Sequence, residues 1–543
     1  PTDEVQVYLC DDGNRPEARR LADKWGIRYL AREDHTGAKA GNLNYAMAHS
    51  RGEIVVTMDA DMVMKPHFLT HTIGHFVASD VAFVQVPQAF YNPDVFQHNL
   101  YAEEVMRNDQ DFFMRFIEPQ RDRHNATIYI GSGAAFRRSA LESIGGFVDD
   151  VITEDMATGL LLQNAGWTSV YVNEVLATGL SPETYAEMLK QRIRWARGNV
   201  QVLKKYGPHK LTNLNFVQRA FLLDAVHHWF FGVYQLFYWL LPIVTIVGGI
   251  RLVEGNIALF LTLWAVQFAY SRYIYEAITQ GRFKSVWTNI YEIAQGPQIA
   301  VAVLAELLFA RTVKFQVTSK GKEVTRAHFA WDKAWPQLLL FAISTAAMTY
   351  AVVTSYHQGW QYLETIIIPF GWMAYNYICL FAAILTAIDQ PRFRHRLANY
   401  NAPARLYSAD GSAREVSVRG LHIQKVCWVM QRSQWEQLKT PDGAIEIAGF
   451  PAALDYTIER ADEVEGSVFV FARLGAVEQQ TFAHMMLLLN QLNTQRFQHR
   501  PQATRMGLYD ATIGLIARRI TVTDRITGAS RARQLPVLSQ PHH

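Results

Sequence analysis

The fold is decided by a short stretch near the start of the chain, IVVTMDAD, which covers residues 54–61. Its first five residues are apolar or β-branched and predict a buried strand, and Asp59 and Asp61 follow at the carboxyl end of that strand. Open α/β sheets bind ligands at the carboxyl ends of their strands. Two carboxylates one residue apart can hold Mg²⁺ or Mn²⁺, which prefer oxygen ligands and often bridge to substrate phosphates. A solvated turn is the alternative for so short a pattern.

Strand signals of the same kind recur on both sides of this stretch. They occupy residues 5–9, 27–30, 82–86, 127–130 and 169–172, with amphipathic helical stretches such as 15–25 and 43–50 between them. Strands that alternate with helices predict a mostly parallel α/β sheet, in a domain that we place at residues 1–215. Asp11-Asp12-Gly13 forms a second acidic strand end, and Lys39-Ala40-Gly41-Asn42 places a cation at a helix start that can accept phosphate.

The next part of the chain, residues 216–390, is much more apolar. Four uncharged runs cover residues 229–250, 255–271, 335–363 and 365–388. About 20 such residues span a bilayer, so we expect membrane helices rather than buried core helices. Basic residues gather before the first run, between the second and third, and after the fourth, which places the α/β domain and the C-terminus in the cytosol. Residues 291–310 are expected to form an amphipathic helix at the membrane surface.

Composition agrees with a chain that is part soluble and part membrane-embedded. Of the 543 residues, 50% are hydrophobic and only 19% are charged, which excludes disorder, collagen and coiled coil. The net charge of +3 is too small to indicate a nucleic-acid partner. Three distant cysteines exclude a disulfide framework and a cysteine zinc site. Short strand-like runs predict a small β-barrel or sandwich at residues 391–525, followed by a polar tail at 526–543.

Two further motifs carry chemistry. Thr153-Glu154-Asp155 precedes a helical stretch and offers carboxylates, although a threonine N-cap with acids in the first turn is the alternative. Gln191-Arg192-Ile193-Arg194-Trp195 lies on a helix that leads towards the apolar part of the chain. An arginine there can pair with phosphate, and an indole can stack on the apolar face of a sugar. The alternative for this second motif is an interfacial belt of tryptophan and arginine.

In this order, and ahead of membrane spans, these motifs resemble those of the processive family 2 glycosyltransferases. The resemblance is to bacterial cellulose synthases and related β-glucan synthases of the curdlan type, and it runs from about Val5 to Gln390. It includes Lys39-Ala40-Gly41-Asn42 and residues 315–321, which look like the gating loop of that family. The resemblance implies a cytosolic glycosyltransferase A-type α/β fold in the bacterial inner membrane. It also implies that the first strand and the opening membrane helices lie outside this sequence.

The resemblance further implies a role for each motif residue. Asp11, Asp12 and Asp59 would bind the nucleotide of UDP-glucose, Lys39, Gln191 and Arg194 its diphosphate, and Asp61 the metal. Asp155 would be the general base, while Glu154 and Trp195 would bind the acceptor sugar. Phe315, Val317, Thr318 and Lys320 would close over the donor.

The implied activity is processive, inverting transfer of glucose from UDP-glucose to a growing β-glucan that is moved across the membrane. Segments near the implied acceptor pocket depart from the cellulose synthase pattern: Tyr129-Ile130-Gly131-Ser132-Gly133, Gly37 and Val86-Pro87-Gln88. These departures favour a β-1,3 or mixed linkage over β-1,4. Cellulose itself and a polymer containing N-acetylglucosamine are the alternatives. Besides donor, polymer and lipid, an accessory subunit on the periplasmic side is an expected partner.

The C-terminal unit resembles the PilZ domain of bacterial cellulose synthases. Arg392 and Arg396 fit its Arg-x-x-x-Arg signature, and Ser417 and Gly420 fit the second signature, in which Glu415 replaces the usual aspartate. The resemblance implies cyclic di-GMP as an allosteric activator, with arginines on phosphate and guanine. A positive-inside cluster after the last membrane span is the alternative for the two arginines.

Overall fold

The computed structural model describes residues 5–103, 106–251, 256–279, 285–309, 326–391, 398–408, 411–422, 425–438, 440–464 and 467–475, with a few single residues besides. The chain forms two compact units. One comprises Pro1–Asn99, Met106–Lys320 and His328–Asp389 and holds the α/β domain and the long helices. The other comprises Leu100–Val105, Gly321–Ala327 and Gln390–His543 and holds the β-barrel.

The α/β domain is built around strand β5 (Val81–Gln85), all five residues of which are buried. β5 runs parallel to β8 (Thr168–Tyr171) and antiparallel to β7 (Ala134–Arg137), which in turn pairs antiparallel with β3 (Ile54–Thr57). The sheet order is β3-β7-β5-β8. The sheet is therefore mixed, and the prediction of a mostly parallel sheet is wrong at β7.

The error at β7 has a local cause. Residues 127–130, predicted as a strand, belong to no strand or helix. Gly131 and Gly133 then take left-handed backbone conformations, with φ of 86° and 68°, and redirect the chain. The strand begins only after this turn, at Ala134, and runs in the opposite sense to its neighbours.

Two smaller sheets and several helices complete the domain. β1 (Tyr8–Cys10) pairs parallel with β2 (Arg28–Leu30), and β4 (Met62–Met64), β9 (Ala177–Gly179) and β6 (Gln88–Phe90) form a three-stranded sheet. The longer helices are α1 (Pro16–Trp25), α2 (Ala38–Ala48), α7 (Glu154–Asn164) and α8 (Tyr185–Lys205). The shorter ones are α3 (Phe68–Thr72), η1 (Ile73–Val77), α4 (Val95–Asn99), η2 (Phe113–Ile117), α5 (Glu118–Asp122) and α6 (Arg138–Ser143).

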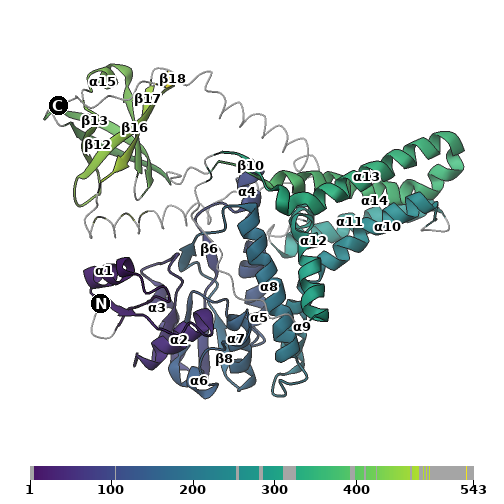
Figure 1. Cartoon of the computed structure of the whole chain (residues 1–543), viewed down its shortest axis with the longest axis horizontal. Coiled ribbons are helices and arrows are strands. Elements are labelled where there is room, and N and C mark those ends of the chain that lie inside the picture. Colours follow the sequence, from purple (N-terminus) through teal and green to yellow (C-terminus); the bar gives the residue numbers. More distant parts are fainter. Residues whose placement is uncertain are drawn as a thin grey trace. The chain divides into compact units, whose positions relative to one another are not determined.

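Within the part of the chain that the structure describes, four helices are long and apolar enough to cross a membrane, as the uncharged runs predicted: α10 (Phe231–Gly248), α11 (Ile257–Ile278), α13 (Trp331–Gln358) and α14 (Trp360–Thr386). Two others accompany them, α9 (Phe216–His228) and α12 (Ser285–Leu308). α12 covers most of the predicted amphipathic segment and packs against α8 of the α/β domain and against α10 and α14 (Figure 1). A short ladder of β10 (His328–Phe329) and β11 (Ile388–Asp389) joins the ends of α13 and α14.

The C-terminal unit is a closed six-stranded antiparallel barrel. Its strands are β12 (Ala398–Ser408), β13 (Ala413–His422), β14 (Lys425–Gln431), β15 (Asp442–Ile447), β16 (Leu454–Val464) and β17 (Ser467–Leu474), with α15 (Arg432–Glu436) and β18 (Arg533–Gln534) beside them. Pairing of β15 with both β12 and β16 closes the barrel. Fully buried Trp428 and Leu406 belong to its apolar core, and the predicted barrel is confirmed.

Candidate active site

The first acidic strand end is held by its own neighbours. Asp11 follows β1 and is only 2% exposed. Its carboxylate accepts hydrogen bonds from the Arg15 guanidinium at 2.7 and 3.0 Å, from the Tyr29 hydroxyl at 2.9 Å, and from the backbone N–H groups of Gly13 and Arg15. Burial alone would raise the pKa of Asp11, but these hydrogen bonds outweigh it and hold the pKa well below its ordinary value.

Asp12 positions the segment that carries Lys39. Its two carboxylate oxygens accept from Nε and Nη2 of Arg32 at 2.7 and 2.9 Å. The same guanidinium donates to the carbonyl oxygens of Thr36 and Ala38 at 2.7 and 2.6 Å. Gly41 permits this close approach, since a Cβ there would lie 2.1 Å from the Thr36 carbonyl oxygen. The start of α2 is thus tied to the strand end at Asp12.

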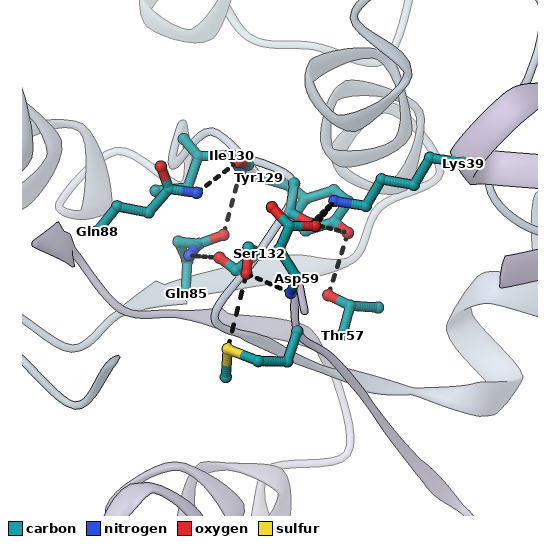
Figure 2. A network of polar contacts seen from close by, with 10 residues as sticks. Lys39, Thr57, Asp59, Gln85, Gln88, Tyr129, Ile130 and Ser132 are labelled. Atoms are coloured by element: carbon teal, nitrogen blue, oxygen red, sulfur yellow. Dashed lines mark hydrogen bonds and ion pairs between the residues drawn. The ribbon is translucent and has the colours of Figure 1, made fainter. Parts of the chain in front are cut away.

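Lys39 connects α2 to the Asp59-x-Asp61 motif. Its ammonium group forms an ion pair with Asp59 and donates to the carbonyl oxygen of Gly131 at 2.7 Å. The backbone N–H of Asp59 donates to the Ser132 hydroxyl at 3.0 Å. Figure 2 shows Lys39, Asp59 and Ser132 converging from three separate segments of the chain.

Asp61 lies half-buried, two residues after Asp59. The pKa of Tyr91 is raised to about 12, mainly by burial and additionally by the negative charges of Asp61 and Glu183. Within the described residues no group of three His, Cys, Asp or Glu side chains could hold a metal alone. The donor set at Asp59 and Asp61 nevertheless fits Mg²⁺ or Mn²⁺, because such ions are commonly held by one or two carboxylates together with substrate phosphates.

The third acidic motif is the first turn of α7, and it is not capped as the alternative interpretation predicted. The Thr153 side chain makes no capping hydrogen bond. Instead it packs against α8, where a Cβ on Gly198 would lie 2.4 Å from Thr153 Cγ2. Absence of a side chain at Gly198 therefore lets α8 approach the Glu154–Asp155 turn closely.

Burial dominates the electrostatics of this turn. The pKa of Asp155 is raised by desolvation, against the lowering effects of the Met156 N–H, Lys39 and Arg194. The pKa of Glu154 is raised by desolvation and by the charge of Asp155. Burial also lowers the pKa of the Arg194 guanidinium, opposed by Glu154, Asp155 and Asp59. A carboxyl with a raised pKa is a stronger base once ionised.

Gly131 is where these groups meet. A Cβ at this position would lie 2.8 Å from Asp155 Oδ2 and 3.6 Å from Lys39 Nζ. The structure therefore brings Lys39, Asp59 and Asp155 together around one glycine of the 131–133 turn. The charges of Asp59 and Asp155 also act on Arg194. Sequence motifs identified these residues, and the resemblance placed residues 129–133 near the acceptor, but neither predicted that Lys39 and Asp155 meet at Gly131.

The remaining motif residues lie on α8. Gln191 is buried, and among the described residues its Oε1 has no hydrogen-bond partner. The Arg192 guanidinium forms an ion pair with Asp109 and lies 4.5 Å from the ring centroid of Trp195. Trp195 packs edge-on against Trp229, with ring centroids 6.4 Å apart. α8 thus presents a half-buried indole beside Trp229, which lies between α9 and α10.

Some predicted residues are not tested by this geometry. Phe315, Val317, Thr318 and Lys320, together with Arg392 and Arg396, lie outside the described residues. Ser417 and Gly420 lie on β13 of the barrel, where Ser417 pairs with Pro403 and Val429. Glu415 lies 3.6 Å from Arg405 in an exposed ion pair on the same sheet.

Comparison with known proteins shows which families the chain resembles. Residues 54–273 match the model of the glycosyl transferase family group 2. The chain is 30% identical, over 464 residues, to the cellulose synthase 1 catalytic subunit [UDP-forming] of Komagataeibacter xylinus, covering 82% of this chain and 60% of that protein. It is 30% identical, over 418 residues, to the cellulose synthase catalytic subunit [UDP-forming] of Pseudomonas fluorescens, covering 76% and 56%.

The chain spans little more than half the length of these two relatives. Among solved structures, a mannosyltransferase from Pyrobaculum calidifontis in complex with GDP-Man and Mn²⁺ has a TM-score of 0.34 and 18% identity, covering 57% of this chain and 80% of that one. The family match shows a family 2 glycosyltransferase domain at residues 54–273, and the two relatives show that most of this chain is similar to cellulose synthase catalytic subunits.

Proposed function

We propose that the protein is a membrane-embedded, processive, inverting glucosyltransferase that builds a β-glucan from UDP-glucose. The observation that carries the proposal is the meeting of Lys39, Asp59 and Asp155 at Gly131, beside a helix that bears Arg194 and Trp195. Cations, a carboxylate pair and a buried base at one point are what transfer from a sugar nucleotide requires. The printed names of the relatives, UDP-forming cellulose synthases, support the donor.

The donor would lie along the two acidic strand ends. Asp11, Asp12 and Asp59 would bind the nucleotide, and Lys39, Gln191 and Arg194 would neutralise its diphosphate. Asp61, with Asp59 beside it, would hold Mg²⁺ or Mn²⁺, which supplies further charge neutralisation at the leaving diphosphate when bound. Lys39 already pairs with Asp59, so donor binding would exchange part of that ion pair for contacts with phosphate.

Asp155 would act at the acceptor. Its carboxylate takes the proton from the acceptor hydroxyl as that oxygen attacks the anomeric carbon, while the bond from this carbon to the diphosphate breaks and UDP leaves. One displacement converts an α-linked donor to a β-linked product, and it needs no second carboxyl as nucleophile. Glu154 and the Trp195 ring would hold the terminal sugar of the acceptor.

The polymer would then leave through the helical part of the chain. Trp195 and Trp229 pack together where α8 meets the start of α10, and Tyr238 and Trp372 pack edge-on further along, with centroids 5.0 Å apart. Such rings can stack on sugars. The proposal includes a bacterial inner-membrane location with cytosolic catalytic and C-terminal domains, an accessory subunit outside, and residues 315–321 closing over the donor.

Two finer points belong to the same proposal. The linkage is β-1,4 or, as the departures near the acceptor favour, β-1,3 or mixed, and the names of the relatives support β-1,4 at least as well. The barrel would bind cyclic di-GMP as an activator through Arg392 and Arg396, with Ser417 and Gly420 on β13 contributing.

The decisive experiment uses purified protein in detergent or nanodiscs with radiolabelled UDP-glucose, with and without Mn²⁺ or Mg²⁺. We expect insoluble radiolabelled polymer that requires the metal. Digestion with linkage-specific glucanases then assigns the product, since sensitivity only to a β-1,4 enzyme makes it cellulose. Polymer from UDP-N-acetylglucosamine but none from UDP-glucose would contradict the proposed donor.

A further inference from the structure

Gln85 is a buried polar residue at the end of an otherwise apolar strand. It closes β5, and none of its surface is exposed. Its Nε2 donates to the carbonyl oxygens of Val86, Ser132 and Gly133 at 2.8, 2.9 and 3.0 Å, and its Oε1 accepts from the backbone N–H of Ile130 at 3.1 Å. A buried amide without hydrogen-bond partners destabilises a fold. The Gln85 side chain therefore depends on residues 130–133 for its partners, and it holds those residues in place in return.

A second amide holds the same residues from the other side. Gln88 Nε2 donates to the Ile130 carbonyl oxygen at 3.0 Å (Figure 2). The Gly131 carbonyl oxygen accepts from Lys39 and from the Tyr129 hydroxyl, at 2.7 and 3.1 Å. With the two contacts of Gln85, every carbonyl group from residue 130 to 133 therefore accepts a hydrogen bond from a side chain. We refer to residues 130–133 as the floor segment.

The floor segment needs such support because of its backbone. Gly131 and Gly133 have φ of 86° and 68°. Glycine loses more conformational freedom on ordering than any other residue, so two left-handed glycines within three residues would not hold one conformation by themselves. Side-chain hydrogen bonds that are already present in the free protein fix the segment before any ligand arrives.

The floor segment borders the space beside Asp155. Oδ2 of Asp155 lies within 2.8 Å of where a Cβ on Gly131 would be. A general base must lie within hydrogen-bond reach of the hydroxyl it deprotonates. If Asp155 is that base, the acceptor sugar must occupy space next to the floor segment, and a shift of the segment would move the acceptor relative to the base.

We infer that Gln85 is a positioning residue, which fixes the floor segment so that one hydroxyl of a pyranose acceptor faces Asp155, with Gln88 supporting the same segment. This inference rests on the proposed function. It assigns to Gln85 no contact with the donor. Asp11 and Asp12 lie on another strand end, and Lys39 and Asp59 contact the floor segment at the Gly131 carbonyl oxygen and the Ser132 hydroxyl, two groups to which Gln85 makes no hydrogen bond among the described residues. Loss of Gln85 therefore affects transfer to the acceptor more than binding of UDP.

The test compares Gln85→Met with Gln163→Met. Gln163 is a matched control, because it is also a buried glutamine. Its Nε2 donates to the Thr127 carbonyl oxygen at 2.8 Å, three residues before the floor segment, and to the Ser169 hydroxyl at 3.2 Å. We expect Gln85→Met to lower kcat for polymer synthesis about 10- to 100-fold, to raise the share of donor lost to hydrolysis, and to leave the Kd for UDP within about twofold. Gln163→Met should retain kcat within about threefold.

A second variant, Gln85→Glu, adds a pH readout. The protonated acid keeps one donor and its acceptor, and the ionised acid loses the donor and repels the carbonyl oxygens. Polymer synthesis by Gln85→Glu, relative to wild type, should therefore fall as pH rises.

Equal synthesis by Gln85→Met and Gln163→Met would overturn the inference, as would parallel loss of UDP binding and synthesis in Gln85→Met. Wild-type protein that makes no polymer from UDP-glucose would instead reject the proposed function, before any variant is compared.

Discussion

The Asp11 and Asp155 sites lie in one domain and are electrostatic opposites. Asp11 is almost fully buried, yet guanidinium, hydroxyl and backbone donors surround it and its pKa is lowered. Asp155 accepts a hydrogen bond from the backbone N–H of Met156, and desolvation raises its pKa. The same side chain therefore favours the ionised form in one place and the protonated form in the other.

This difference matches the two roles that we propose. A residue that binds a nucleotide through fixed hydrogen bonds should keep one charge state, and the partners of Asp11 ensure that. A general base must accept a proton during the reaction, and a raised pKa makes its carboxylate a stronger base. Each prediction below changes one side of this comparison, beginning with the largest expected effect and ending with the smallest.

Asp155→Asn should remove the base and little else. We expect polymer synthesis to fall by about 10²- to 10⁴-fold, the range for loss of a general base, with the Kd for UDP almost unchanged. Incorporation of radiolabelled glucose and UDP binding by calorimetry measure the two effects. Wild-type turnover in this variant would show that Asp155 is not the base and that its raised pKa has another origin.

The same substitution should stabilise the fold. Because the pKa of Asp155 is higher in the folded protein, the unfolded chain ionises first as pH rises, and stability falls above the ordinary carboxyl pKa. Asparagine removes this cost, so the thermal midpoint should rise by about 1–3 °C at pH 7.5 and be unchanged near pH 3.

Asp11→Asn should have the opposite effect on stability. Its lowered pKa stabilises the fold above the ordinary carboxyl pKa, and that contribution is lost as pH falls. We expect a loss of about 1–3 kcal/mol at pH 7.5, because the charged partner of Arg15 and Tyr29 disappears, together with a higher KM for UDP-glucose. Thermal unfolding at two pH values measures the first effect. A stability loss that does not shrink as pH falls from 7.5 towards the lowered pKa of folded Asp11 would contradict the ionised state of Asp11.

Sequence motifs predicted the charged residues of both sites but not their partners. Asp155, Lys39 and Asp59 belong to short patterns with recognisable order. Arg32 and Gln85 belong to no such pattern, because each has hydrogen-bond partners on another segment of the chain. Gln85 and Ser132, for example, are 47 positions apart. Nothing in a single sequence marks such a pair. The signal that could have indicated Gln85 is a polar residue at the end of the apolar run Val81–Gln85.

The fold shows the same division between local and distant information. The β-barrel and the four apolar helices follow from the periodicity and length of each segment, and both were predicted. The antiparallel sense of β7 was not, because it depends on a turn at Gly131 and Gly133 whose geometry depends on Gln85, Gln88 and Lys39. Local patterns give elements, whereas long-range hydrogen bonds decide how a chain turns between them.

The smallest predicted effect concerns the neighbour of Asp155. Two adjacent carboxylates repel, so each makes it harder for the other to ionise. The pKa of Glu154 is itself raised by burial and by the charge of Asp155. Glu154→Gln removes one of these charges while Lys39 and Arg194 remain. In the pH profile of kcat/KM, the acid limb should therefore move to lower pH by roughly half a pH unit, with Asp155 still active as the base. A limb that moves to higher pH, or does not move, would mean that burial alone controls Asp155 and that the two carboxyls are not coupled.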